Sequence, residues 1–269
     1  MKVRLDSYLA ALGLVESREK AKALIMSGEV FVNGQRADKP GMQTDEGDNV
    51  QVRTPVLKYV SRGGYKLEKA IEHFGITLLG SVAADIGAST GGFTDCMLKY
   101  GAKRVYAVDV GYGQLAWELR NDNRVVVLER TNARYLSEKS ITEKLDFFCV
   151  DVSFISLGLI LPPALNLLKP EATAVCLIKP QFEAGKDKVG KHGIIRDKAT
   201  HIDVLNNFMD LARKNECSTL GLTYSPIKGP KGNIEFLAHI CKAPTASPII
   251  NIKDLVEEAH KSLTNNKPQ

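Results

Sequence analysis

The feature that most constrains this fold is a glycine-rich turn at residues 85–93, which reads DIGASTGGF. A short apolar segment comes before the turn, and a helix-like pattern follows it from Phe93. Because glycine has no Cβ, the three glycines let a strand turn sharply into a helix and bring the backbone close to a ligand. The turn therefore predicts an α/β sheet with a nucleotide-like ligand where the strand ends.

The residues of the turn indicate which ligand binds there. A dinucleotide-binding loop, G-x-G-x-x-G, needs glycine at its second conserved position to contact a pyrophosphate, and Ser89 occupies that position. Asp85 adds a negative charge, and Asp109 ends the next apolar run, where it can hold ribose hydroxyls. We therefore expect a cationic ligand without phosphate, S-adenosylmethionine. An ordinary strand-to-helix turn capped by aspartates is the alternative.

Composition places the chain among globular proteins. Its 269 residues suffice for a medium and a small domain, and 44% hydrophobic and 25% charged residues are close to the globular average. No apolar run is long enough for a membrane helix, and the first residues lack a signal-peptide core. We expect a cytoplasmic protein that does not enter a membrane.

The five cysteines are widely spaced and odd in number, so we expect them to be reduced core residues. Neither cysteines nor histidines have the spacing of metal ligands. We therefore expect no disulfide framework and no metal.

The chain divides into two parts. Residues 1–54 form a small α+β unit, 55–60 form a linker because Thr54-Pro55 disfavours helix, and 61–269 form a larger α/β domain. In the first part we expect helices at 5–12 and 18–28 and strands at 30–34 and 48–52.

In the second part, strands and helices alternate. The expected helices lie at 64–74, 92–100, 155–168, 200–214 and 252–263. The expected strands lie at 82–86, 104–109, 125–128, 146–151, 172–178, 217–225 and 233–241. This order predicts a mostly parallel sheet whose final pair is an antiparallel hairpin.

The first part resembles S4-type RNA-binding domains. The resemblance rests on Arg4-Leu5-Asp6, Ser17-Arg18, residues 21–25, Gly28 and the Val-x-Val-Asn-Gly run at 30–34. It implies RNA contacts by Arg4, Ser17, Arg18, Lys20 and Lys22. From the residues alone, Arg18 and Lys22 share one helix face, which fits an RNA-binding module or, as the alternative, a charged packing module.

Charged residues also follow the buried-looking strands of the second part. In a doubly wound sheet, reactive groups collect beyond the carboxyl ends of the strands. Asp151 and Lys179 each follow an apolar strand, where an unpaired charge is costly, so we expect them to pair. Glu235 stands at the start of an antiparallel strand, and Lys66 begins the helix before the first strand.

This quartet occurs within a wider resemblance. The chain resembles the TlyA (haemolysin A) family of ribosomal RNA methyltransferases, whose catalytic half is similar to FtsJ-type 2′-O-methyltransferases. The resemblance rests on residues 61–67, 85–93, 151–156, 178–183 and 231–236. It implies a Rossmann-like methyltransferase sheet. It also implies transfer of a methyl group to the ribose of a cytidine in ribosomal RNA, with ribosomal subunits as partners. Lys66, Asp151, Lys179 and Glu235 would form its catalytic tetrad.

A ribose 2′-hydroxyl is a weak acid, so its methylation needs orientation and a nearby proton acceptor or cation. A neutral Lys179 can accept the proton, while Asp151 and Glu235 hold the two lysines in place. A charged Lys179 that orients the oxygen is equally consistent. The alternative is that the four charges only pair with one another.

Position along the strands predicts the cofactor contacts, with Asp109 at the ribose and Asn132 near the adenine. The full set is Asp85, Gly87, Ala88, Ser89, Gly91, Asp109, Asn132 and Asp151. The net charge of +5 includes basic clusters that fit RNA phosphates or, alternatively, solvated loops. The expected phosphate contacts in this part are Arg62, Lys186, Lys188, Lys191 and Arg196, and we expect the loop 183–196 to order on RNA binding.

Two other functions are alternatives to methyl transfer. The haemolysin name suggests a membrane-active protein, against which the absence of a transmembrane pattern argues. A non-catalytic RNA-binding factor in ribosome assembly is the other, and the intact tetrad disfavours it.

Overall fold

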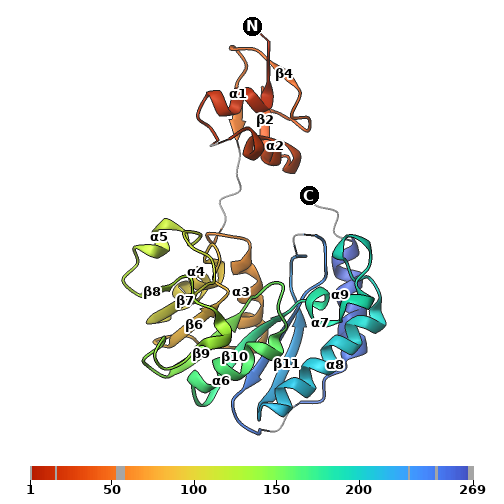
Figure 1. The fold of residues 1–269 in the computed structure, drawn as a ribbon. Coiled ribbons are helices and arrows are strands. Elements are labelled where there is room, and N and C mark those ends of the chain that lie inside the picture. Colours follow the sequence, from red (N-terminus) through yellow and green to blue (C-terminus); the bar gives the residue numbers. More distant parts are fainter. Residues whose placement is uncertain (1, 16, 53–57, 230, 246–247, 266–269) are drawn as a thin grey trace. The chain divides into compact units, whose positions relative to one another are not determined.

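The computed structural model describes residues 2–15, 17–52, 58–229, 231–245 and 248–265 (Figure 1). The chain forms two compact units, Met1–Leu57 and Lys58–Gln269. Of the linker expected at 55–60, residues 55–57 lie outside the described part. Tyr59 and Val60 pack in a hydrophobic core of the second unit.

The described part of the first unit consists of short helices and small antiparallel sheets. Its helices are α1 (Leu5–Ala11) and α2 (Arg18–Ser27). One sheet joins β3 (Gln35–Arg36), β2 (Val30–Val32) and β5 (Val50–Val52), and the other joins β1 (Val3–Arg4) and β4 (Gln43–Thr44). The expected helices and the β2–β5 pair are therefore confirmed. The strands β1, β3 and β4 were not predicted, because two residues are too few to show an alternating pattern.

The ends of α2 follow from its sequence. The Ser17 hydroxyl accepts a hydrogen bond from the Lys20 backbone N–H at 3.2 Å, and the helix ends at Gly28 in the left-handed conformation. Leu9, Ile25 and Val32 belong to the core that the helices and β2 enclose.

The second unit is built on a seven-stranded sheet in the order β11-β12-β10-β9-β6-β7-β8. Its strands are β6 (Val82–Ile86), β7 (Arg104–Val108), β8 (Val125–Leu128), β9 (Leu145–Val150), β10 (Leu168–Ile178), β11 (Ser218–Tyr224) and β12 (Phe236–Cys241). Strands β6 to β10 pair in parallel, whereas β12 runs antiparallel to both β10 and β11. The predicted mostly parallel sheet with an antiparallel final pair is confirmed.

Helices cover both faces of this sheet (Figure 1). One face packs against α3 (Gly63–Phe74) and α4 (Gly92–Lys99), and the other against α6 (Leu161–Leu167), α8 (Lys198–Lys214) and α9 (Ile252–Asn265). Successive residues of β6 point to opposite faces. Ala83 belongs to the core on the side of α3 and α4, and Ala84 to the core on the side of α6, α8 and α9. All five cysteines are buried.

The largest differences from the expected bounds concern one helix and one strand. The helix predicted at 155–168 begins only at Leu161, after a 3₁₀ turn at Leu157–Leu159, because prolines occupy its first turn. Strand β10 starts at Leu168, four residues before the predicted start, and its pairing with β9 shifts register between Leu168 and Thr173.

The register brings several strand ends to one edge of the sheet. Ile86 lies opposite Val108 and Val150, and Ile178 lies opposite Phe236. The residues that follow the parallel strands therefore meet those that precede β12. In the described part of the chain, no helix is both long and apolar enough to cross a membrane.

Candidate active site

The four predicted catalytic residues line a single cavity of about 490 Å³ at this edge of the sheet. Asp151 follows β9, Lys179 follows β10, Glu235 precedes β12, and Lys66 lies in the first turns of α3. Residues that are far apart in the chain thus meet because of the strand order.

The tetrad forms two ion pairs. The Lys179 amine lies 2.5 Å from Asp151 Oδ1 and donates a hydrogen bond to the Ser153 hydroxyl at 2.8 Å. The Lys66 amine lies 2.6 Å from Glu235 Oε2. The pairing of Asp151 with Lys179 that the sequence predicted is present. Both lysines are almost fully buried, so each carboxylate compensates a charge that would otherwise be costly.

Glu235 is the most enclosed member of the tetrad. Its side chain has no exposed surface, and its Oε1 has no hydrogen-bond partner among the described residues. A Cβ on Gly229 would lie 2.4 Å from this oxygen, so the Gly229 backbone closes over the carboxylate. Lys66 is therefore the described group that balances its charge.

We call the cavity lined by the tetrad the catalytic cavity. Two further cavities adjoin it, and both share Gly87, Ser89 and Asp151 with it. One, of about 440 Å³, is lined by the starts of α3 and α4 and by Asp85, Gly87, Ala88, Ser89 and Asp151. The other, of about 660 Å³, is lined by Gly87, Ser89, Asp109, Asn132 and Asp151 and by apolar side chains that include Val152 and Ile160. The apolar walls with a carboxylate at their rim fit an adenosine, and the acid-lined cavity fits a cationic amino acid group. These residues therefore fit S-adenosylmethionine.

The glycine-rich turn is shaped by close backbone approach. Gly87 has φ 94°, and a Cβ there would lie 2.3 Å from the Asp151 carbonyl oxygen. Ser89 also has a positive φ, and its N–H donates to Asp109 Oδ2 at 2.8 Å. The Gly111 N–H donates to the other Asp109 oxygen at 2.7 Å. These bonds fix the Asp109 carboxylate at the cavity rim.

Two of the predicted cofactor contacts have evident structural roles. Gly91 does not line any of the three cavities, and a Cβ there would meet Leu119 Cδ1 at 2.3 Å. Packing and its φ of 95° therefore account for this glycine. Asn132 lines the largest cavity, and its side-chain oxygen accepts the Arg134 N–H at 3.1 Å at the start of a 3₁₀ turn. Their cofactor contacts stay predictions.

Asp85 lies beneath the turn with no exposed surface. One of its oxygens accepts hydrogen bonds from the Thr94 N–H at 2.8 Å and the Thr94 hydroxyl at 2.7 Å. Burial raises the pKa of Asp85 to about 7, and the charge of Asp151 adds to this effect, while the Thr94 bonds oppose it. The carboxyl therefore changes charge near neutral pH, at the wall of a cavity suited to a cation.

Asp85 thereby predicts a pH dependence of cofactor binding. With a pKa of about 7, roughly a tenth of the carboxyl groups are ionised at pH 6 and roughly nine tenths at pH 8. A bound cation favours the ionised form, so we expect affinity for S-adenosylmethionine to rise about 5- to 10-fold from pH 6 to pH 8, with proton release. Isothermal titration calorimetry in buffers of different ionisation enthalpy measures both.

The variant Asp85→Asn keeps an oxygen for Thr94 and removes the titration, so its affinity should be nearly flat over this range. An equally steep dependence in the variant would contradict the assignment to Asp85. In the protein without cofactor, the effect of pH on folding stability has the opposite sign to its effect on cofactor affinity. The unfolded carboxyl loses its proton near pH 3.8, before the folded one, so this group lowers stability as pH rises from about 4 to 7.

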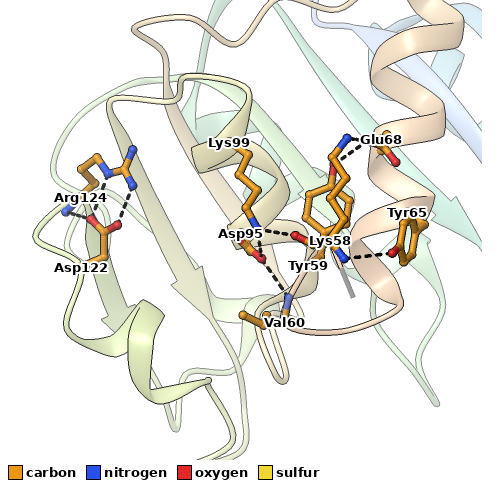
Figure 2. A network of polar contacts seen from close by, with 9 residues as sticks. All are labelled: Lys58, Tyr59, Val60, Tyr65, Glu68, Asp95, Lys99, Asp122 and Arg124. Carbon is orange, nitrogen blue, oxygen red and sulfur yellow. Dashed lines mark hydrogen bonds and ion pairs between the residues drawn. The ribbon is translucent and has the colours of Figure 1, made fainter. Parts of the chain in front are cut away.

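The segment that enters the second unit is fixed to both helices at the cofactor side (Figure 2). The Val60 N–H donates to Asp95 of α4 at 2.9 Å, and the Tyr59 hydroxyl donates to Glu68 of α3 at 2.7 Å. The Lys58 amine pairs with the same Glu68 carboxylate. Because the first turns of α3 and α4 line the smaller cofactor-side cavity, these contacts hold one wall of that cavity in place.

In the first unit, two of the predicted RNA contacts share one buried carboxylate. Asp6 accepts hydrogen bonds from Arg4 at 2.9 Å and from Arg18 at 3.4 Å, and these bonds hold the pKa of Asp6 well below its usual range. Both arginine side chains remain about half exposed, at 49% and 50%. The Ser17 hydroxyl caps α2, and Lys20 and Lys22 lie on that helix. The structure thus gathers basic groups at the start of α2.

The predicted RNA contacts of the second unit are more dispersed. Arg62 lines the smaller cofactor-side cavity, and its guanidinium donates to the Lys228 carbonyl at 3.4 Å. Lys188 pairs with Asp203 of α8 at 2.8 Å, and Arg196 is exposed. The side chains of Lys186 and Lys191 are not among those that the structure describes. That the loop 183–196 orders on RNA binding stays a prediction.

Several residues at the site were not predicted. Phe154 lines the catalytic cavity, is 87% exposed and has φ 63°, and its ring lies 5.0 Å from that of Phe182 between centroids. Ser153 bonds Lys179, and Lys231 and Asn233 also line the cavity. A phenylalanine in an apolar context is indistinguishable from a core residue in the sequence. Only the proximity of Ser153 to Asp151 in the chain could have indicated its role.

Among the residues that the structure describes, no group of three His, Cys, Asp or Glu side chains is arranged to hold a metal ion.

Comparisons with known proteins cover both units. Residues 59–242 match the FtsJ-like methyltransferase family, and residues 3–50 match the S4 domain. The protein YqxC of Bacillus subtilis is 50% identical over 272 residues, with 99% of this chain and 97% of the relative covered. The 16S/23S rRNA (cytidine-2′-O)-methyltransferase TlyA of Mycobacterium tuberculosis is 39% identical, with 98% of each chain covered. A solved structure from Streptococcus thermophilus is 45% identical, covers 100% of this chain and 99% of that chain, and has a TM-score of 0.81.

Proposed function

This chain belongs to the family of FtsJ-like methyltransferases, and we propose that it transfers the methyl group of S-adenosylmethionine to the ribose 2′-hydroxyl of a cytidine in ribosomal RNA. The observation that carries the proposal is the pair of ion pairs, Lys66–Glu235 and Lys179–Asp151, in one cavity that adjoins the cofactor-sized cavities. The choice of cytidine is supported by a relative that is named as a cytidine-2′-O-methyltransferase and is 39% identical over nearly the whole chain.

The bound cofactor supplies a methyl group on a positively charged sulfur. Lys179 has three N–H donors when charged, and Asp151 and Ser153 accept two of them, which leaves one for the ribose oxygen. In this role Lys179 orients a lone pair of the oxygen toward the methyl group. In its neutral form, Lys179 would instead take the hydroxyl proton. Lys66 and Glu235 line the same cavity, and in this role they fix the position of the ribose.

An exposed aromatic ring gives the cavity a surface for the nucleobase. Phe154 and Phe182 contact each other beside Lys179, whose amine lies 6.0 Å from the Phe182 ring centroid. A positive φ is unfavourable for phenylalanine and is retained in folds mainly where it serves a site. We infer that a base unstacked from RNA packs on Phe154, as is usual for recognition of single-stranded RNA.

The variant Phe154→Ala is therefore expected to raise KM for RNA by about 5- to 150-fold, since stacking of one base contributes about 1–3 kcal/mol. Affinity for S-adenosylmethionine should stay unchanged. Steady-state kinetics with an RNA fragment and calorimetry with the cofactor separate the two effects. Phe154→Tyr keeps the ring and should behave like the unaltered protein. An unchanged KM in Phe154→Ala would exclude stacking at this position.

The first unit supports binding to structured RNA. Its match to the S4 domain and the exposed arginines at Asp6 fit contacts to phosphates. We infer that ribosomal subunits in the cytoplasm are the partners.

The direct test is methyl transfer. The protein is incubated with each ribosomal subunit, and with each naked ribosomal RNA, in the presence of cofactor carrying a labelled methyl group. Mass spectrometry of nuclease fragments then locates the label. We expect a 2′-O-methylcytidine in at least one substrate. RNA binding without transfer to any substrate would favour the assembly-factor alternative, and lysis of cells by protein freed of RNA would favour membrane activity.

A further inference from the structure

A fourth cavity, of about 380 Å³, lies beside the catalytic cavity and is lined by basic side chains. Arg196, Lys228 and Lys231 contribute three positive charges, and His260 forms part of the wall. No aspartate or glutamate lines it. A cavity whose charged lining groups are all basic is suited to an anion.

Within the part of the chain that the structure describes, the cations of this cavity are not used in ion pairs. Among the described residues, Arg196, Lys228 and Lys231 form no salt bridge, whereas nearby Lys188 and Lys198 pair with Asp203 and Glu257. Three neighbouring positive charges without acidic partners repel one another, which lowers stability unless a ligand compensates them. The arrangement therefore favours binding over packing as their role.

The basic cavity is continuous with the active site through shared residues. Lys231 lines both this cavity and the catalytic cavity, and Lys228 lines both this cavity and the smaller cofactor-side cavity. Arg62 reaches the Lys228 carbonyl. An anion bound here would therefore lie next to a nucleotide whose ribose occupies the catalytic cavity.

The wall between the two cavities is fixed by a buried amide. Asn233 is 2% exposed, donates to the Gly193 carbonyl at 2.9 Å and accepts the Ile195 N–H at 2.9 Å. Gly193 lines the catalytic cavity, and Ile195 lines the basic one. Asn233 therefore holds this part of the loop in one position relative to both cavities, so the basic cavity is a preformed feature.

We propose that Arg196, Lys228 and Lys231 bind a phosphodiester of the RNA next to the methylated nucleotide. The proposal rests on the proposed function, because it takes the nucleotide in the catalytic cavity as given. Arginine and lysine are the usual ligands of RNA phosphates, arginine through paired N–H donors and lysine through its charge. Phosphate contacts of this kind set the register of the strand and leave base selection to other groups.

The test compares the double variant Lys228→Met/Lys231→Met with Lys169→Met. Lys169 is a half-exposed lysine at the start of β10 whose amine pairs with Asp146, so it controls for loss of a surface charge. Binding of a ribosomal RNA fragment that the unaltered protein binds is measured by fluorescence anisotropy at several salt concentrations. We expect the slope of log K against log salt to fall by about 0.7 in the double variant, which is the value for one phosphate contact on a single strand. We expect KM for RNA to rise at least tenfold, while cofactor affinity and melting temperature match the control.

A second measurement identifies the phosphodiester. A single methylphosphonate, which is uncharged, is placed in turn at the linkages on either side of the target nucleotide. One position should weaken binding to the unaltered protein but not to the double variant. A free-phosphate site would instead be blocked by millimolar inorganic phosphate and be indifferent to both methylphosphonates, which would overturn the proposal.

The two proposals fail in different ways. If the double variant keeps the salt slope and KM of Lys169→Met while transfer proceeds, the phosphate pocket is wrong and the methyltransferase assignment stands. If the slope falls but no RNA is methylated by the unaltered protein, the pocket stands and the proposed reaction is wrong.

Discussion

Replacement of Lys179 by alanine is expected to lower kcat by about 100- to 10,000-fold, the range typical for loss of a group that moves or orients a proton at a reacting atom. The Lys179 amine is held by Asp151 at 2.5 Å and by Ser153 at 2.8 Å, at the wall of the cavity that would receive the ribose. Alanine removes the amine that we propose to orient the 2′-oxygen or accept its proton. Affinity for S-adenosylmethionine should be nearly retained, because Lys179 does not line the cofactor-side cavities.

Single-turnover kinetics measures the rate of methyl transfer, steady-state kinetics measures kcat, and calorimetry measures the affinity for S-adenosylmethionine. Lys169→Ala, at the opposite end of the same strand, is the matched control and should transfer at the normal rate. More than a tenth of normal kcat in Lys179→Ala would remove this residue from the reaction. Lys179→Arg separates its two possible roles, since arginine stays charged. Partial activity would indicate orientation by a cation, and a loss equal to that of alanine would indicate proton acceptance.

The second large effect concerns the Lys66–Glu235 pair. Lys66→Met should lower the free energy of unfolding of the second unit by about 3–5 kcal/mol, because it leaves a carboxylate without exposed surface and without its cation. The double variant Lys66→Met/Glu235→Leu removes both charges and should recover most of that stability. It should nevertheless have no transferase activity, since both side chains line the catalytic cavity.

Urea denaturation followed by circular dichroism measures these free energies. A matched surface pair provides the control, because Arg213→Ala on α8 breaks an exposed ion pair with Asp210 and should cost less than about 1 kcal/mol. A loss of the same small size in Lys66→Met would show that the buried pair does not stabilise the fold. Recovery of activity in the double variant would show that neither residue acts in transfer.

Much of the fold followed from local sequence patterns. Apolar periodicity located the strands of the second unit to within a few residues, except for the start of β10, and placed the helices on either side of them. Strands as short as β1 and β4 were missed, because two residues give no periodicity. The late start of α6 was missed because its prolines begin a helix as readily as they interrupt one.

The candidate site was predicted unevenly. Lys66, Asp151, Lys179 and Glu235 were identified by resemblance and by their positions at strand ends, and the structure places them around one cavity. The cofactor contact of Gly91 stays a prediction, and a Cβ at this position would meet Leu115 and Leu119. A glycine required by packing and one required by a ligand look the same in a sequence, because both reflect only the lack of room for a Cβ.

The sequence by itself determined the order of strands and helices, the glycine-rich turn at 85–93 and the chemical types of the reacting side chains, since these depend on near neighbours in the chain. Only the tertiary structure decided that Lys66 pairs with Glu235, 169 residues away, and that Lys228 and Lys231 line a basic cavity beside them. Such contacts arise because β12 inserts between β10 and β11 in the sheet. Strand order is set by the burial of both faces of the whole sheet, and no local segment carries that information.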